Sequence, residues 1–213
     1  MLILTCSSQL QRLEGALRRS LPYALPVLGA VMNINRGNPG EYEVLLDSWP
    51  DFGAVLARPR GEVPAGDLQW ARGGHGEPGL AMGSSRRDLM GAVAGEYLSW
   101  TWGCWGALGA RVRLDPGVRV TSLSPEHVDL LNETWTYGGN SHSRNYLAEL
   151  VDRFPHVCLQ DGAGQPLCWV LSDPFGTGAH GYTLPSHRRR GYMQAALTFA
   201  ARRAQARGFP TFG

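Results

Sequence analysis

Residues 180–193 combine the residue types best suited to binding an anion. They read as a short strand, an arginine-rich turn and a helix that begins at Arg190 or Gly191. The first backbone N–H groups of a helix have no partner within the helix and carry partial positive charge. A glycine there lets a phosphate approach the backbone closely, and neighbouring arginines add fixed positive charge. The pattern therefore indicates a pyrophosphate-binding turn.

Two other interpretations of this turn stay open from the residues alone. One is a solvated basic helix start, or a run of the nuclear-localisation type. The other is a module that binds RNA or another polyanion through arginines around the last helix, with Tyr192 for stacking. Those arginines are Arg188, Arg189, Arg190, Arg202, Arg203 and Arg207. The 20 Lys and Arg residues against 18 Asp and Glu leave a formal charge of +2, which argues against nucleic acid as a partner.

Other kinds of catalysis are excluded or unsupported by the residues present. The sequence contains no lysine, so Schiff-base and P-loop lysines are ruled out. No G-x-S-x-G elbow supports a serine nucleophile. Four histidines lack the spacing of metal ligands, and no metal is expected. They are His75, His127, His142 and His156.

Length and composition are those of a folded protein with a core. The chain has 213 residues, of which 43% are hydrophobic and 18% charged. No apolar run approaches the ~20 residues of a membrane span, and the first residues lack the basic start of a secretory signal. The cysteines form no C-x-x-C pair, so we interpret them as reduced thiols of an intracellular protein. They are Cys6, Cys104, Cys158 and Cys168.

A small α+β unit is expected near the N-terminus. Leucines at helical spacing predict a first helix with Ser8 as its N-cap. The leucines are Leu10, Leu13, Leu17 and Leu21. Residues 26–35 and 42–47 read as two strands of a hairpin, joined by the turn chemistry of residues 36–40. Residues 52–57 form a third candidate strand.

The segment from about residue 58 to residue 114 gives no clear prediction of secondary structure. Residues 86–98 have helical spacing, weakened by two glycines. Trp100, Trp102 and Trp105 alternate with small residues. This alternation suits a strand with one buried face, or a poorly ordered segment with exposed aromatic side chains.

Regular elements return from residue 117. A strand over residues 119–123 is followed by a helix with Ser124 as N-cap and Pro125 in its first turn. The further expected elements are a helix over 143–154, strands over 157–160, 166–172 and 180–184, and a final helix to about residue 207. The buried stripe of the final helix is predicted at Met193, Leu197, Ala200 and Ala204.

The turn and the order of these elements together resemble the GNAT acyltransferase superfamily. Arg188, Gly191 and Met193 fall on its Q/R-x-x-G-x-G/A signature, which cradles the pyrophosphate of coenzyme A. Met193 stands where glycine or alanine is usual in that signature. The order of strand, two helices, hairpin, strand and signature helix is also the order of the GNAT core.

A closer resemblance is to the glycine N-acyltransferase-like family. The similar blocks are residues 31–39 and 47–52, residues 130–135 and 138–140, and residues 181–192 and 207–210. They spread the resemblance over about residues 1–60 and 117–213. Such enzymes join an acyl group from acyl-CoA to the amino group of glycine or a similar amino acid. The partners implied are therefore small-molecule substrates, with acyl-CoA as the cosubstrate and no membrane span.

The resemblance implies an α+β fold in two parts. Residues 117–213 would form a GNAT-like mixed sheet flanked by helices. Residues 1–116 would form a smaller α+β domain, in which residues 61–110 diverge from the family. The sequence ends where the next GNAT strand is expected, so the last GNAT strands should be missing and the product incomplete. A catalytically inactive relative that keeps the anion-binding turn is the alternative to an active enzyme.

The resemblance also implies roles for individual residues. Tyr182, Thr183 and Leu184 would offer backbone groups to the pantetheine arm. The pyrophosphate would bind at Arg188, Arg189, Arg190, Gly191, Tyr192 and Met193. Family members transfer the acyl group directly to the amino acid, so no acyl-enzyme nucleophile is implied.

A general base is needed to take a proton from the attacking amino group. The family's glutamate aligns with Thr177 here, which cannot serve as a base. His180 is the nearest residue with a suitable ordinary pKa, and Asp173 is a second candidate. The family location is mitochondrial, which the arginine-bearing first helix also suits, and the cytoplasm is the alternative.

Overall fold

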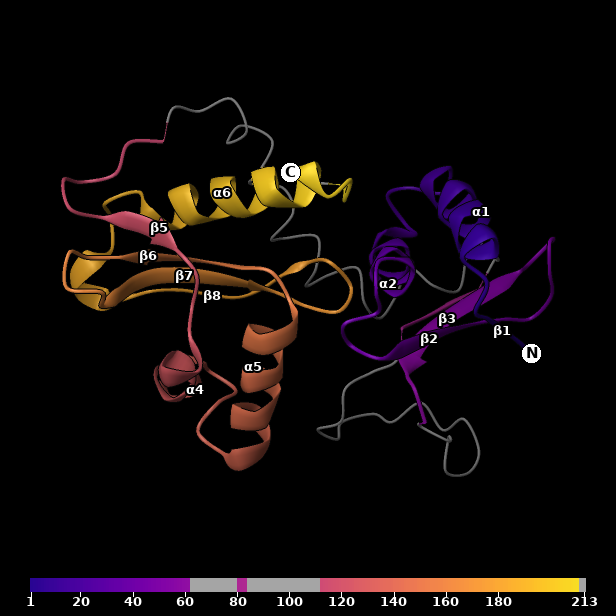
Figure 1. The fold of residues 1–213 in the computed structure, drawn as a ribbon, viewed down its shortest axis with the longest axis horizontal. Helices are drawn as coiled ribbons and strands as arrows, with labels where there is room; N and C mark the ends of the chain where they lie inside the picture. The colour runs from indigo at the N-terminus through magenta and orange to yellow at the C-terminus, as the bar shows by residue number, and fades with distance from the viewer. Residues whose placement is uncertain (62–79, 84–111, 211–213) are drawn as a thin grey trace. The chain divides into compact units, whose positions relative to one another are not determined.

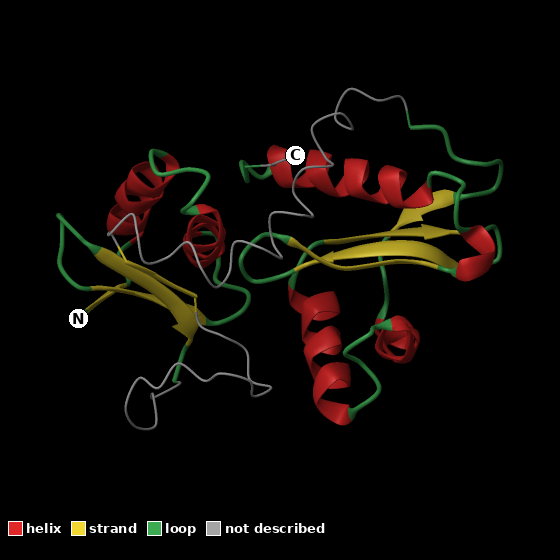
Figure 2. Ribbon diagram, turned by 180° about the vertical axis from the view of Figure 1, so that it is seen from behind, coloured by secondary structure: helices red, strands yellow, loops and turns green. Residues whose placement is uncertain are grey.

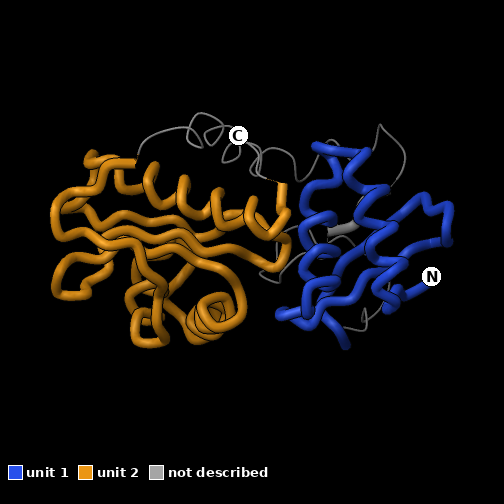
Figure 3. The backbone as a smooth tube through the Cα atoms, turned by 45° about the horizontal axis from the view of Figure 1, so that its top comes forward, with its two compact units in different colours: residues 1–92 blue, residues 93–213 orange. Residues whose placement is uncertain are grey.

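The computed structural model describes residues 1–61, 80–83 and 112–210. The chain divides into two compact units, residues 1–92 and 93–213, which are described separately (Figure 3). The helix expected over residues 86–98 and the tryptophan-rich segment near residue 100 lie outside the described residues. No described helix has the length and apolar character needed to cross a membrane.

Unit 1 is an antiparallel sheet with two helices. Its elements are β1 (Leu2–Leu4), α1 (Ser7–Arg18), α2 (Leu25–Asn35), β2 (Tyr42–Leu46), β3 (Ala54–Pro59) and β4 (Leu80–Gly83). The strands pair in the order β1-β2-β3-β4. α2 packs against the sheet and α1 packs against α2 (Figure 1). The small α+β unit expected near the N-terminus is therefore present.

The strand predicted over residues 26–35 is wrong, because this segment is the helix α2. Its run of apolar residues fits a strand and a buried helix equally well, and Pro26 in the first turn suits a helix. The helix is buried on nearly every side, so it shows no amphipathic stripe. Residues 36–40 therefore connect a helix to β2, and the Asn38 amide is bound to the backbone of Tyr42 at 2.7 and 2.8 Å.

The N-cap of the first helix lies two residues earlier than predicted. Cys6 is the N-cap of α1, and Ser8 lies within the first turn. Leu10, Leu13 and Leu17 are buried as expected, whereas Leu21 lies beyond the helix end. The buried Glu14 carboxylate accepts hydrogen bonds from Arg36 at 2.9 Å and Asn35 at 3.0 Å, which tie α1 to the end of α2.

Unit 2 is a sheet with helices on both faces (Figures 1 and 2). Its strands are β5 (Arg119–Thr121), β6 (His156–Gln160), β7 (Pro166–Ser172) and β8 (Gly178–Thr183), paired in that order. Its helices are η1 (Pro125–His127), α4 (Val128–Thr134), α5 (Ser141–Arg153), η2 (Pro185–His187) and α6 (Tyr192–Ala206). α4 and α5 lie on one face and α6 on the other. The expected α+β class is confirmed, and the described strands pair only in antiparallel fashion.

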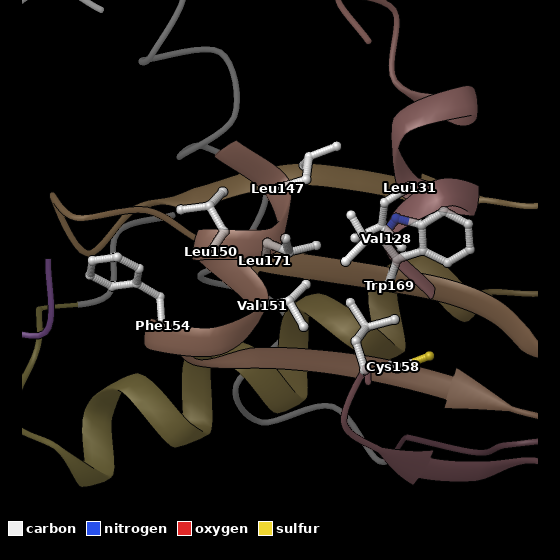
Figure 4. Close-up of a cluster of buried hydrophobic side chains, with 10 residues drawn as sticks. Val128, Leu131, Leu147, Leu150, Val151, Phe154, Cys158, Trp169 and Leu171 are labelled. Atoms are coloured by element: carbon white, nitrogen blue, oxygen red, sulfur yellow. The ribbon is translucent and has the colours of Figure 1, made fainter. Parts of the chain in front are cut away.

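Alternating side chains of β7 pack in two separate clusters of buried residues, one on each face of the sheet. Trp169 and Leu171 point toward α4 and α5 (Figure 4), whereas Cys168 and Val170 point toward α6. Cys158 joins the first cluster. Because Cys158 and Cys168 lie on opposite faces of the sheet, they are not placed to form a disulfide, and both thiols are free.

The helix boundaries of unit 2 follow the sequence signals closely. Ser124 is the N-cap of η1, with Pro125 in its first turn, as predicted.

The buried face of α6 is rotated from the predicted stripe, because Met193, Leu197, Ala200 and Ala204 are only partly buried. The buried residues are Tyr192, Ala195, Ala196, Thr198 and Ala201. Tyr192, Ala195 and Ala196 of this face pack against buried residues of β6 and β7.

Candidate functional site

A β-bulge interrupts β8 next to the arginine-rich turn. Trp169 pairs with Tyr182 and Leu171 pairs with Ala179, so two β8 residues, His180 and Gly181, stand opposite a single β7 residue. His180 has a φ of 37°, in the left-handed region that non-glycine residues seldom occupy. The bulge disrupts the regular ladder at this point and redirects the side chains around it.

A cavity of about 350 Å³ lies where β8, η2 and the start of α6 meet. Its lining residues are Gly181, Tyr182, Thr183, His187, Arg188, Arg189, Gly191, Tyr192, Met193 and Gln194. Most residues named for pantetheine and pyrophosphate therefore surround one cavity. Leu184 and Arg190 do not line it, whereas Gly181, His187 and Gln194 do although no role was predicted for them.

The start of α6 presents unpaired backbone donors to this cavity. Gly191 is the N-cap with a φ of 75°, and no side chain caps the helix. The first intrahelical hydrogen bond of α6 is made by the N–H of Ala195, which donates to the Gly191 carbonyl oxygen at 3.0 Å. The N–H groups of Tyr192, Met193 and Gln194 have no such acceptor within the helix. The geometry can therefore hold an anion at the helix end.

Arg188 is held in place by the strand that precedes it. Its Nε donates to the Thr183 carbonyl oxygen at 3.1 Å. Its guanidinium also lies over the Tyr182 ring, 5.5 Å from the ring centroid. These contacts fix the side chain along the wall of the cavity.

Arg190 turns toward Asp115, which lies shortly before β5. Its guanidinium is 3.5 Å from an Asp115 carboxylate oxygen. The same carboxylate accepts a hydrogen bond of 2.7 Å from the Tyr192 hydroxyl. Burial, followed by this hydrogen bond, raises the pKa of Tyr192. Asp115 precedes the residues it contacts by more than seventy positions, so no local sequence pattern could have identified it.

Met193 and Gly181 are neighbours in the lining of the cavity. A Cβ atom on Gly181 would lie 3.4 Å from Cε and 3.5 Å from Sδ of Met193. The Met193 side chain therefore occupies the space beside the bulge, and a side chain larger than a methyl group at position 181 would press against it.

His180 does not line the cavity, and its ring packs between aromatic side chains. Its ring centroid is 5.6 Å from that of Trp135 and 6.3 Å from that of Trp169. Its Nε2 lies 3.1 Å from the Leu131 carbonyl oxygen and 3.5 Å from the Trp169 indole nitrogen. Because a carbonyl oxygen only accepts, the shorter contact assigns the proton to Nε2 and the lone pair to Nδ1.

Burial lowers the pKa of His180 to about 4, although the Leu131 hydrogen bond acts in the opposite direction. The imidazole is therefore neutral at pH 7. A neutral imidazole can accept a proton, but its basicity is below the ordinary range for histidine.

Asp173 is used by the turn between β7 and β8. Its buried carboxylate accepts hydrogen bonds from the Phe175 N–H at 3.0 Å and the Thr177 N–H at 2.9 Å. The Thr177 hydroxyl donates a third bond at 2.5 Å. Burial raises the pKa of Asp173, against the opposing effect of these hydrogen bonds. Both Asp173 and Thr177 are therefore engaged in the turn.

Two further arginines that a polyanion-binding module would use, Arg203 and Arg207, make contacts within the protein. Arg203 donates to the His156 carbonyl oxygen at 2.7 Å, and Arg207 lies over the Phe209 ring at 5.2 Å. Within the described residues, no three His, Cys, Asp or Glu side chains are grouped as metal ligands would be.

One protein family matches a large part of this sequence. The family model for aralkyl acyl-CoA:amino acid N-acyltransferase matches residues 1–70 and 107–155. These ranges stop before the cavity residues, which fall within the longer matches to curated relatives.

Three curated relatives each align with 100% of this chain and 88% of their own length over 261 residues. Glycine N-acyltransferase-like protein Keg1 of Mus musculus is 28% identical. The glycine N-acyltransferases of Bos taurus and Homo sapiens are 26% and 27% identical.

The fold is similar to that of a solved structure, a Drosophila protein from a structural genomics programme. The TM-score is 0.59 at 13% sequence identity, and the match covers 94% of this chain and 85% of the other. At this identity the likeness supports the fold alone.

Proposed function

Because this chain belongs to the aralkyl acyl-CoA:amino acid N-acyltransferase family, we propose that it transfers an acyl group from acyl-CoA to the amino group of glycine or a related amino acid. The products are an N-acyl amino acid and coenzyme A. The single observation that carries the proposal is the cavity at the β8–α6 junction, where unpaired helix N–H groups and two arginines lie together.

The phosphate end of acyl-CoA is proposed to bind at the start of α6. The N–H groups of Tyr192, Met193 and Gln194 donate to the pyrophosphate, and Gly191 keeps the approach clear of side-chain atoms. The positive end of the helix and the nearby guanidinium groups stabilise its charge. No metal is needed to describe this binding.

The pantetheine arm is proposed to run from this turn along β8 toward the bulge. Tyr182 and Thr183 line the cavity on this path, and their backbone groups can bond the amide groups of the arm. Leu184 contributes less, because its N–H already donates to the Leu167 carbonyl and its side chain packs against the core. The thioester then lies near Gly181, where the ladder is disrupted.

In the reaction the amino nitrogen attacks the thioester carbonyl carbon. The C–N bond forms, the C–S bond breaks, and coenzyme A leaves as the thiolate. We propose His180 as the acceptor of the amine proton through Nδ1, the ring nitrogen that keeps its lone pair. Its position in the bulge adjoins the cavity residue Gly181.

The proposal is tested by incubating the full chain with benzoyl-CoA and glycine and measuring N-benzoylglycine by mass spectrometry. Product is expected only when enzyme, acyl-CoA and glycine are all present. His180→Ala is expected to lower kcat by about a hundredfold or more, and His180→Asn by a similar factor. Asparagine can still donate to the Leu131 carbonyl oxygen, so an active His180→Asn variant would show a positioning role instead.

One observation favours a second candidate, a family member that binds acyl-CoA without turnover. The pKa of about 4 for His180 makes it a weak base at neutral pH. Saturable binding of benzoyl-CoA with no product for glycine or for any other amino acid offered would support this second candidate.

A mitochondrial location is proposed as the family expectation. The arginine-bearing helix α1 buries Leu10, Leu13 and Leu17 in unit 1. If α1 serves as the mitochondrial targeting signal, we therefore expect it to stay in the mature protein, because its cleavage would remove part of the core. Imaging of the full chain with a C-terminal fluorescent tag tests the location. Co-localisation with a mitochondrial marker is expected, and a diffuse cytoplasmic signal would contradict it.

A further inference from the structure

Three aromatic side chains that are not fully buried form a cluster beside His180, on the α4 side of the sheet. The Trp135 ring centroid lies 5.6 Å from that of His180. The Tyr146 ring stacks on Trp135 at 5.9 Å, and the Tyr137 ring meets Trp135 at 6.0 Å and nearly at right angles. We call Trp135, Tyr137 and Tyr146 the aromatic cluster. Its contacting rings lead from His180 to the protein surface, where Tyr137 is 72% exposed.

One backbone carbonyl holds both His180 and Trp135. The Leu131 carbonyl oxygen accepts a hydrogen bond of 3.1 Å from the Trp135 N–H. The same oxygen lies 3.1 Å from the His180 Nε2. Trp135 is also the C-cap of α4, so its backbone is anchored at the end of a helix. The imidazole and the indole are therefore kept together by a shared acceptor as well as by ring packing.

Tyr137 stands on a restrained turn between α4 and α5. The Gly138 N–H donates to the Trp135 carbonyl oxygen at 2.8 Å, and the Gly139 N–H donates to the Asn132 side chain at 3.1 Å. Among the described residues of unit 2, Tyr137 is the one large apolar side chain that the fold leaves exposed. The turn therefore presents an exposed ring at a fixed place beside Trp135.

The acceptor amino acid is the substrate expected to reach this cluster. The acyl-CoA donor is proposed to occupy the cavity, and neither His180 nor a ring of the cluster lines that cavity. His180 is held instead against α4, through the Leu131 carbonyl oxygen. Because the amine approaches His180 to lose its proton, the side chain of the acceptor comes within reach of the rings.

We propose that the acceptor is an amino acid with an aromatic side chain, such as L-phenylalanine, and that Trp135 and Tyr137 select it. This inference rests on the proposed function, which supplies the reaction. Pairs of aromatic rings attract each other beyond the burial of their apolar area, so a phenyl group gains contacts here that glycine cannot make. The faces of the rings carry negative partial charge, so a carboxylate side chain gains no such contact.

The first measurement ranks acceptors with the wild-type chain. Glycine, L-phenylalanine and L-glutamate are each offered with benzoyl-CoA and, separately, with acetyl-CoA. Mass spectrometry of the N-acyl product gives kcat/KM for each amino acid. L-Phenylalanine is expected to exceed glycine about tenfold with either donor, and L-glutamate is not expected to exceed glycine. Glycine equal to or better than L-phenylalanine would overturn the proposal.

The second measurement removes the exposed ring. Tyr137→Ser is expected to lower kcat/KM for L-phenylalanine about tenfold more than for glycine, mainly through KM, because glycine has no side chain to place on the ring. Tyr137→Phe keeps the ring and should keep the preference. Tyr23→Ser is the matched control, because Tyr23 is a 70% exposed tyrosine of unit 1, and it should leave the values for both acceptors unchanged.

Equal losses for the two acceptors in Tyr137→Ser would overturn the proposal, because they would show a structural role. A loss seen with benzoyl-CoA but not with acetyl-CoA would overturn it too, because the ring would then contact the acyl group. The wild-type ranking needs no variant, so it decides the proposal even if Tyr137→Ser does not fold.

Failure of this proposal is distinguishable from failure of the proposed function. Product with glycine but no preference for L-phenylalanine leaves the proposed function intact and removes the inference. No product with any acceptor, from a folded chain that binds benzoyl-CoA, removes both.

Discussion

His180 illustrates how its surroundings set the chemistry of a single residue. Its ring lies between Trp135 and Trp169, and its Nε2–H is committed to the Leu131 carbonyl. The ordinary pKa of a histidine side chain suits a general base. The structure lowers that pKa through burial, which no sequence pattern around residue 180 indicated. His180 lies on β8 next to the cavity residue Gly181 without lining the cavity itself, and its role as the general base stays a prediction.

The stability of the folded chain should depend on pH through this residue. The pKa of His180 is about 4 in the folded state and near the ordinary 6.5 when unfolded. Below pH 6.5 the unfolded chain takes up a proton that the folded chain does not, so the free energy of unfolding falls as the pH is lowered toward 4. Urea unfolding at pH 7, 5.5 and 4 measures this loss.

The matched control for this pH dependence is His180→Asn, which keeps a donor for the Leu131 carbonyl but cannot titrate. The wild type should lose more unfolding free energy between pH 7 and pH 4 than the variant does. Identical losses in the two proteins would show that His180 is not buried in its neutral form.

Gly181 and Met193 together should set the width of the cavity beside the bulge. A valine at position 181 would reach the Met193 side chain, since even a Cβ would lie 3.4 Å from it. Gly181→Val is therefore expected to weaken acyl-CoA binding on the order of tenfold, and Met193→Ala in the same chain should recover part of the loss.

Gly178→Val is the matched control for Gly181→Val, because Gly178 lies on the same strand but does not line the cavity. Calorimetric titration with benzoyl-CoA compares the variants. Equal effects of the two valines would mean that Gly181 acts through the strand and not through the cavity.

At the scale of elements, the side chain of Asn132 holds the corner between α4 and α5. Asn132 of α4 accepts hydrogen bonds from the Ser143 hydroxyl at 2.6 Å and the Gly139 N–H at 3.1 Å. Its amide group also donates to the Asn140 carbonyl at 3.3 Å. The side chain thereby holds the turn between α4 and α5. Because Leu131 lies on α4, the same turn helps to keep the Leu131 carbonyl oxygen beside His180.

Gly138→Ala is expected to break this corner. Its Cβ would lie 2.0 Å from the Asn132 carbonyl oxygen, a backbone atom that cannot move aside without disrupting α4. We expect a loss of about 2 kcal/mol or more in the free energy of unfolding. Gly162→Ala is the control, because nothing lies within 4 Å of its Cβ position. Urea unfolding measures both, and similar stabilities would contradict this account of the corner.

Elements with strong local signals could be predicted from the sequence, and those that depend on distant packing could not. Ser124 with Pro125 marked the start of η1 correctly, because a cap and a first-turn proline act locally. The segment now seen as α2 was predicted as a strand, because a helix buried on nearly every side has no period to read. The bulge in β8 also escaped prediction, since it depends on pairing with β7.

At the scale of the whole molecule, the described cavity is built within unit 2, from residues 181–194. The sequence predicted the strand, the turn and the helix of this region because they follow one another in the chain, and the binding role of the region stays a prediction. From the sequence, the same role was predicted for all three arginines of the turn. The structure shows that they differ in their contacts, because Arg190 pairs with Asp115 and Arg188 donates to the Thr183 carbonyl oxygen. The partner of Arg190, Asp115, comes from far along the chain and needed the fold to be known.

The central claim is that the β8–α6 cavity holds acyl-CoA, and calorimetric titration of the full chain with benzoyl-CoA at two salt concentrations tests it most directly. We predict saturable binding near one site per chain, weaker at the higher salt concentration because phosphate–arginine attraction is screened. A folded chain that shows no saturable binding at either salt concentration would contradict the claim.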